Sequence, residues 1–114
     1  MKYMLLIDSG AAQREFERLP EDERNAIYGE YLAISETPGV IGGHQLQPAS
    51  TATTVRVQDG RTLTTDGPLV ETKEELGGYY LFEANDLDAA IELAARVPAA
   101  RLGGAVEVRP VVER

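Results

Sequence analysis

The side chain in this sequence best suited to acid–base chemistry is Asp66, which comes directly before Gly67 and Pro68. A flexible glycine and a rigid proline shape a loop that can hold a carboxylate at the mouth of a cleft. Loss of water around such a carboxylate favours its protonated form, so that it can exchange a proton with a ligand. The alternative is that Asp66 and Gly67 only form a turn, in which the aspartate accepts hydrogen bonds from nearby backbone amides. Asp66 is therefore the candidate catalytic residue.

Lys73 is a candidate ligand-binding residue in the same stretch of chain. It lies among Glu71, Glu74 and Glu75, and its ammonium group can neutralise a bound carboxylate or phosphate. The alternative is that Lys73 makes solvent-exposed ion pairs with these neighbours, each worth about 0–1 kcal/mol.

His44 and Tyr79 are the other two candidate ligand-binding residues. His44 is the only histidine in the sequence, and an imidazole is the side chain that ordinarily titrates near neutral pH. The alternative for His44 is a plain surface or strand-end position. No motif with metal-ligand spacing accompanies it, so neither a metal site nor another cofactor is expected. Tyr79 and Tyr80 are adjacent on a predicted strand, which sends one ring to each face, and one of them can line a pocket.

Length, charge and the absence of cysteine exclude several classes of protein. The 114 residues suffice for one domain, spanning residues 1–114, and the formal net charge of −8 disfavours nucleic acid as a partner. Without cysteine, disulfides, thiol catalysis and Cys-ligated zinc are excluded. The apolar N-terminal run ends at Asp8, too early for a signal peptide, and no stretch approaches the ~20 apolar residues that a membrane helix needs. A soluble cytoplasmic protein with no membrane partner is expected.

The spacing of apolar residues predicts strands and two long helices. Alternation and β-prone runs indicate strands, whereas apolar residues three and four apart indicate helices. The strands are expected at residues 3–7, on both sides of a turn at 59–60, at 77–82 and at 105–109, and the helices at 20–36 and 87–97. Pro110 restricts the last strand to an edge or an end of the sheet.

The turn at Asp59-Gly60 leaves two registers open for its hairpin. A two-residue loop sets Arg56 opposite Leu63, whereas a three-residue loop with a bulge sets Val57 opposite Leu63. The bulged form is favoured because it keeps apolar side chains together.

Two helices covering one face of a sheet predict an α+β fold, for which a ferredoxin-like split βαβ arrangement with an antiparallel sheet is the closest match. Tyr79, Leu81, Val106 and Val108 are then expected to form a second apolar surface on the other face. Since a soluble monomer seldom exposes a large apolar patch, two copies are expected to pack sheet to sheet.

Several separated motifs together resemble the YCII-related (DGPF-domain) family. They are the N-terminal run 1–7, residues 51–61, residues 65–74, the strand 76–80 and residues 107–111, in this order along nearly the whole chain. The resemblance implies a ferredoxin-like fold that pairs into a homodimeric α+β barrel. Asp66 matches the family's aspartate, and Leu69 stands where the family has phenylalanine. Relatives in the wider superfamily pair this aspartate with a histidine on the first long helix, but residues 20–36 contain none.

The sequence thus predicts a homodimer that binds a small molecule in a cleft between sheet and helices, with acid–base catalysis through Asp66 at the rim. The alternative is a noncatalytic interaction or regulatory module. Some members of the family are associated with extracytoplasmic-function sigma factors, which favours a link to that regulation. However, the chain has no helix-turn-helix motif and carries the wrong charge for DNA.

Overall fold

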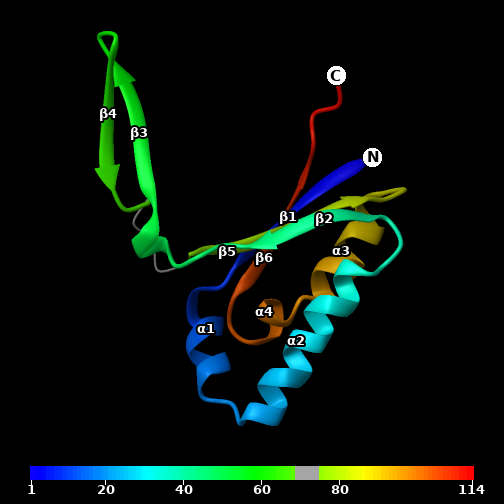
Figure 1. The fold of residues 1–114 in the computed structure, drawn as a ribbon. Helices are drawn as coiled ribbons and strands as arrows, with labels where there is room; N and C mark the ends of the chain where they lie inside the picture. The colour runs from blue at the N-terminus through cyan, green and yellow to red at the C-terminus, as the bar shows by residue number, and fades with distance from the viewer. Residues whose placement is uncertain (69–74) are drawn as a thin grey trace.

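Figure 1 shows a sheet with all helices on one side and a separate hairpin on the other. The computed structural model describes residues 1–68 and 75–114. The strands are β1 (Lys2–Asp8), β2 (Val40–Gln45), β3 (Thr53–Gln58), β4 (Arg61–Asp66), β5 (Leu76–Glu83) and β6 (Ala105–Pro110). The helices are α1 (Gly10–Glu17), α2 (Glu21–Ser35), α3 (Leu87–Arg96) and the short α4 (Pro98–Arg101), with one 3-10 turn, η1 (Ala49–Thr51).

The main sheet is antiparallel, with the strand order β2-β5-β1-β6. Apart from the β3–β4 hairpin, the chain runs strand, helices, two strands, helices, strand, which is the predicted split βαβ arrangement. β5 occupies a central position, and β6, which ends at Pro110, lies at an edge. The predicted α+β fold with an antiparallel sheet is confirmed.

The core lies between the sheet and the helices. Alternate residues of β1, namely Tyr3, Leu5 and Ile7, are buried against the helices, as are Tyr80 and Phe82 of β5. This alternation follows from the two-residue period of a strand, so the opposite set of side chains faces away from the helices. The sheet therefore has one covered face and one face without helices, which we call the open face.

The two long helices begin and end close to the predicted positions. Pro20 precedes the first turn of α2. In that turn, the carboxylates of Glu21 and Asp22 lie near the positive end of the helix dipole, which stabilises the helix. The carboxylate of Asp86 caps α3 by accepting a hydrogen bond of 2.9 Å from the backbone amide of Ala89. These local signals fix the two elements that cover most of the sheet.

The predicted bulge in the hairpin is wrong. Arg56 pairs with Leu63 and Gln58 pairs with Arg61, so that the loop contains only Asp59 and Gly60. Both loop residues have positive φ, +51° and +75°, which is the backbone geometry of the tight turn whose twist matches that of the strands. Among the described residues, none of this hairpin belongs to the buried core, so burial does not force its apolar side chains into register.

The predicted second apolar surface needs a partial correction. Val106 and Val108 pair with Ile7 and Leu5 and pack against the core, so they lie on the covered face. The pairing of β6 with β1 sets these two valines directly opposite buried residues of β1, and paired residues of neighbouring strands lie on the same face of a sheet. Tyr79 and Leu81 do face away from the helices.

Candidate functional site

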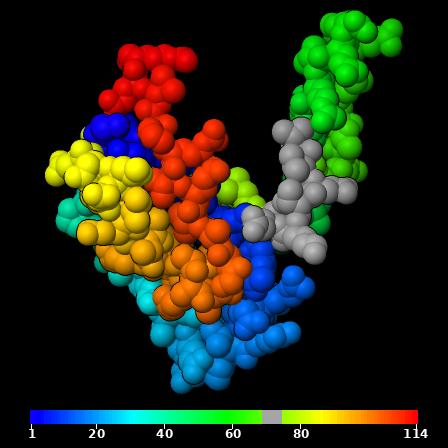
Figure 2. Space-filling model, turned by 180° about the vertical axis from the view of Figure 1, so that it is seen from behind, coloured from blue at the N-terminus to red at the C-terminus, as the bar shows by residue number. Residues whose placement is uncertain are grey.

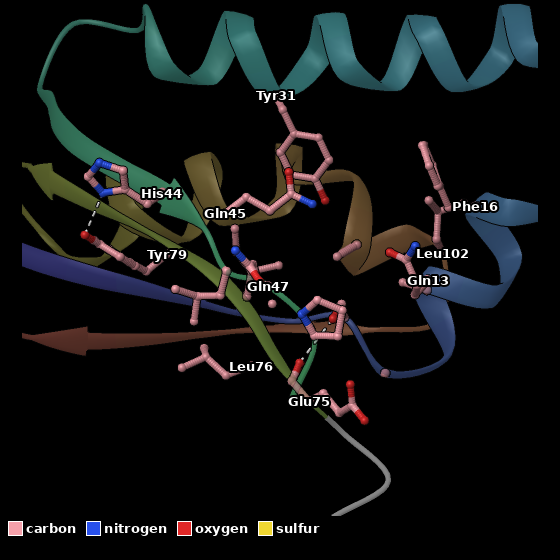
Figure 3. Close-up of a pocket in the computed structure, with 18 of the residues that line it drawn as sticks. Gln13, Phe16, Tyr31, His44, Gln45, Gln47, Glu75, Leu76, Tyr79 and Leu102 are labelled. Atoms are coloured by element: carbon pink, nitrogen blue, oxygen red, sulfur yellow. Dashed lines mark hydrogen bonds between the residues drawn. The ribbon is translucent and has the colours of Figure 1, made fainter. Parts of the chain in front are cut away.

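A cleft of about 560 Å³ opens between α1, α2 and the adjoining ends of β1, β2 and β5. This volume lies within the range of small-molecule sites. Figure 3 shows α2 forming one wall, with the ring of Tyr31 directed into the cleft, and the end of β2 forming another with Gln45. The cleft lies between the sheet and the helices, where a ligand site is expected from the sequence.

Three glutamine side chains supply amide groups to the cleft. Gln13 comes from α1, Gln45 ends β2 and Gln47 follows it. The amide nitrogen of Gln13 donates to a carboxylate oxygen of Glu17 at 3.2 Å. Among the described residues, the amides of Gln45 and Gln47 make no side-chain hydrogen bond within the protein. Both amides are therefore free to donate to, and accept from, a ligand.

Tyr31 and Tyr80 line the cleft, and each contributes an apolar ring and a polar hydroxyl. The hydroxyl of Tyr80 donates to the backbone carbonyl of Tyr31 at 3.0 Å, which ties β5 to α2. Burial raises the pKa of Tyr31, and burial likewise raises the pKa of Tyr80. Both phenols therefore stay neutral over the physiological range.

An aromatic pair closes the outer wall of the cleft. The rings of Phe16 on α1 and Tyr28 on α2 meet edge to face, with centroids 5.3 Å apart and an interplanar angle of 74°. Such pairs stabilise beyond their buried area and hold the two helices at a fixed separation. Together with Tyr31, they give the cleft flat apolar surfaces suited to a ring.

The described part of the cleft lining carries negative charge. Among the described residues that line it, Glu17 and Glu75 carry carboxylates, and none is lysine or arginine. The backbone carbonyl of Glu75 accepts hydrogen bonds from the amide of Ser9 at 2.8 Å and from its hydroxyl at 3.2 Å, which anchors this edge of the cleft. Since like charges repel, this lining favours an uncharged ligand over an anion.

His44 and Tyr79, both predicted to bind ligand, are brought together. They are paired residues of β2 and β5, and Nδ1 of His44 lies 2.8 Å from the hydroxyl oxygen of Tyr79, the hydrogen bond dashed in Figure 3. Their rings are 5.7 Å apart. Both residues border the cleft, yet strand alternation turns their side chains toward the open face, away from Tyr80.

Asp66 is placed apart from this pair, at the end of β4. Its side chain is exposed, and it is not among the described residues that line the cleft. The following Gly67 has a φ of +105°, and its amide donates to the carbonyl of Ala52 at 2.8 Å. The hydroxyl of Thr54 donates to the carbonyl of Gly67, also at 2.8 Å. These bonds fix the base of the hairpin, from which Asp66 projects.

Three other expectations concern Lys73, a metal site and a membrane-spanning helix. Lys73, the third predicted ligand-binding residue, lies outside the described residues. Within residues 1–68 and 75–114, no group of three or more His, Asp or Glu side chains is arranged to hold a metal ion. In the same part of the chain, no helix has the length and apolar character needed to cross a membrane.

Sequence reasoning missed the glutamines and Tyr31. A lone glutamine carries no motif, and Gln45 enters the cleft only because its pairing with Gly78 turns it toward the helices. Tyr31 lies on the apolar stripe of its helix, where periodicity predicts core packing rather than a ligand contact. The sequence did hold one signal, because a tyrosine in an apolar stripe carries a polar hydroxyl that can reach a ligand.

The raised pKa values of Tyr31 and Tyr80 predict a loss of stability in alkali. Above pH 10, the unfolded chain releases these phenolic protons while the folded chain retains them, so the free energy of unfolding falls as pH rises further. Below pH 10 neither tyrosine contributes a slope. Urea unfolding between pH 9 and 11.5 should show a shallower decline for Tyr31→Phe than for the unaltered protein. Identical slopes would contradict the assignment of this effect to Tyr31.

Comparison with known proteins gives three similarities. The model of the YCII-related domain matches residues 1–114. An uncharacterized protein of Rhizobium meliloti (strain 1021) is 34% identical over 106 residues, which cover 92% of this chain and 82% of that protein. The solved structure of 5-chloro-2-hydroxyhydroquinone dehydrochlorinase (TftG) from Burkholderia phenoliruptrix AC1100, in complex with 2,5-dihydroxybenzoquinone, is similar in fold. Its TM-score is 0.51 at 16% identity, with 100% of this chain and 96% of that chain covered.

Proposed function

The chain belongs to the YCII-related family, and we propose that it is a homodimer that binds a small, uncharged, hydroxylated aromatic molecule in the cleft, with Asp66 as the acid–base residue. The observation that carries this proposal is the cleft itself, in which free amides and neutral phenols converge between aromatic walls. Apolar walls with a few convergent polar groups are characteristic of ligand sites.

The chemistry of the lining supports a planar, neutral ligand with hydroxyl or carbonyl groups. The rings of Phe16, Tyr28 and Tyr31 offer flat apolar contact, and the amides of Gln45 and Gln47 offer a donor and an acceptor each. Glu17 and Glu75 oppose an anion. The ring compound in the complex of the dehydrochlorinase of similar fold is likewise a planar ring that carries hydroxyl and carbonyl groups.

The position of Asp66 supports a role at the rim of the cleft. Gly67, its neighbour, is bonded to Ala52, which directly follows the 3-10 turn whose first residue, Ala49, lines the cleft. A carboxylate at such an edge can take a proton from a ring hydroxyl and return it to a ring carbon or oxygen. When one hydroxyl proton of 5-chloro-2-hydroxyhydroquinone, the substrate named for the dehydrochlorinase, is moved to the ring carbon that bears chlorine, the C–Cl bond can break as a second hydroxyl loses its proton, which gives a hydroxyquinone and HCl. Release of chloride is therefore an assay for such proton transfer.

Calorimetry with a pair of matched ring compounds tests the binding proposal. Hydroquinone is neutral at pH 7, whereas 4-hydroxybenzoate has one hydroxyl replaced by a carboxylate. Because Glu17 and Glu75 repel the carboxylate, we expect hydroquinone to bind about 10-fold more tightly or better. Equal or tighter binding of 4-hydroxybenzoate would contradict a site for neutral ligands, and binding of neither compound would remove hydroxylated rings as the ligand class.

A further inference from the structure

One hydroxyl group in the cleft carries a proton that no group in the described part of the chain accepts. It belongs to Tyr31, whose half-buried ring points from α2 into the cleft in Figure 3. The neighbouring hydroxyl of Tyr80 differs, because it donates its proton to the backbone carbonyl of Tyr31 at 3.0 Å. Within residues 1–68 and 75–114, the proton of the Tyr31 hydroxyl has no such acceptor.

The oxygen of this hydroxyl is held in place by α4. In Figure 1, α4 lies between α1 and α2, and Figure 2 shows it from behind, in orange, packed beside the blue α1. Ala99 follows Pro98 in the first turn of α4, where backbone amides have no acceptor within the helix. Ala99 is buried, and its amide donates instead to the hydroxyl oxygen of Tyr31. The backbone thus orients this hydroxyl and leaves its proton for the cleft.

Tyr31 is therefore a hydrogen-bond donor toward a ligand. Burial raises its pKa, so the phenol keeps its proton at neutral pH. The amides of Gln45 and Gln47 each carry a donor and an acceptor and can turn either one toward a ligand. Tyr31, by contrast, has its oxygen engaged by Ala99 and offers its proton. The part of the ligand that lies against Tyr31 must then be an acceptor.

We infer that Tyr31 determines the specificity of the cleft: its hydroxyl donates to a carbonyl oxygen on the ligand ring and selects that group over a hydroxyl at the same position. A conjugated carbonyl oxygen accepts a strong hydrogen bond, whereas a phenolic oxygen shares a lone pair with its ring and accepts weakly. A ligand hydroxyl would also need an acceptor for its own proton. The inference rests on the proposed function, because it concerns the ring ligand of the same cleft.

A carbonyl also arises on a hydroxylated ring when a proton moves from a hydroxyl to a ring carbon. In the proposed transfer through Asp66, the O–H bond breaks, a C–H bond forms and the oxygen left behind becomes a carbonyl, with no net oxidation or reduction. A hydrogen bond from Tyr31 to that oxygen strengthens as the carbonyl forms, so it stabilises the keto form more than the hydroxyl form. For a hydroxylated substrate, Tyr31 therefore acts on turnover more than on affinity.

Two rings of the same shape separate a carbonyl from a hydroxyl. N-methyl-4-pyridone and 4-methylphenol are both uncharged at pH 7, and each carries a methyl group opposite its oxygen, which is a carbonyl in the first and a hydroxyl in the second. Calorimetry should show that Tyr31→Phe weakens binding of the pyridone by about 10-fold and binding of the methylphenol by about 3-fold or less. Tyr3→Phe is the matched control, because the hydroxyl of Tyr3 contacts the sulfur of Met1 outside the cleft lining. It should change neither affinity.

The chloride assay gives a second readout on the same variants. Tyr31→Phe should lower kcat by about 10-fold with little change in KM, whereas Tyr3→Phe should leave both values unchanged. Urea unfolding at pH 7 checks that both variants are folded. A rise in KM at unchanged kcat would contradict stabilisation of the keto form by Tyr31.

The binding data separate failure of the inference from failure of the proposed function. Equal losses for both rings, or no loss for the pyridone, would overturn the inference, since Tyr31 would then contribute no directional hydrogen bond. Binding of hydroquinone without any binding of the pyridone would also overturn it and retain the proposed function. If the unaltered protein binds the pyridone but neither hydroxylated ring, the proposed ligand class fails, while the effect of Tyr31→Phe on the pyridone still decides the inference. Binding of none of the three rings would overturn both.

Discussion

Replacing Asp66 by asparagine should lower turnover by about 100-fold or more, since general acid–base catalysis contributes about 10²–10⁴ to a rate. Asparagine has nearly the size of aspartate and keeps its hydrogen-bonding capacity, but it does not exchange a proton at neutral pH. The side chain is exposed at the end of β4, so the fold and the affinity for hydroquinone should change little. The measurement is the initial rate of chloride release in the assay described above, alongside calorimetry of hydroquinone binding.

Asp88→Asn is the matched control, because Asp88 is also an exposed aspartate but lies on α3, outside the cleft lining. It should retain the rate of the unaltered protein. If Asp66→Asn retains that rate as well, Asp66 has no catalytic role. If the unaltered protein releases no chloride but binds hydroquinone, the noncatalytic alternative is favoured for this substrate.

Filling the cleft with an indole should reduce the affinity for hydroquinone by about 100-fold or more. In Gln45→Trp, the new ring enters the space into which Gln45 points in Figure 3 and excludes a ligand ring of similar size. The same change removes one free amide, so a polar contact is lost together with the space. Tryptophan is well accepted in strands, and Gln45 is an exposed residue at the end of β2. Calorimetry measures the affinity, and urea unfolding checks that stability is preserved.

Leu32→Trp serves as the control for this variant, because it places the same ring on α2 at an exposed position outside the cleft lining. Its affinity for hydroquinone should equal that of the unaltered protein. Unimpaired binding by Gln45→Trp would show that the ligand does not occupy the cleft. Equal loss in both variants would indicate an indirect effect of tryptophan on the fold.

Elements with strong local signals were predictable. The buried run 3–7, the proline and acidic start of α2 and the cap of α3 by Asp86 each carry a signal within a few residues. The order of these elements then led to the split βαβ arrangement, which the strand order β2-β5-β1-β6 confirms. These features depend on the spacing of apolar residues and on helix capping, and both are determined by residues that are close together in the sequence.

Elements without such signals escaped prediction. The helix α1, residues Gly10–Glu17, is short and starts with glycine, so packing of the buried Ala12 stabilises it rather than its own propensity. The strand β2 contains Gly42 and Gly43, which weaken strand preference. Gly43 is required there nonetheless, since a Cβ atom would lie 2.6 Å from the carbonyl oxygen of Tyr79 on the paired strand.

The sequence by itself determined the order of the long helices and central strands, the acidic charge and the residues capable of proton exchange. Only the tertiary structure decided which of those residues meet. It paired His44 with Tyr79 on the open face, left Asp66 at the base of the β3–β4 hairpin and turned Gln45 toward Tyr31. The physical reason is that local periodicity depends on residues a few positions apart, whereas contacts between distant strands depend on register. A shift of one residue in register moves a side chain from one face of the sheet to the other.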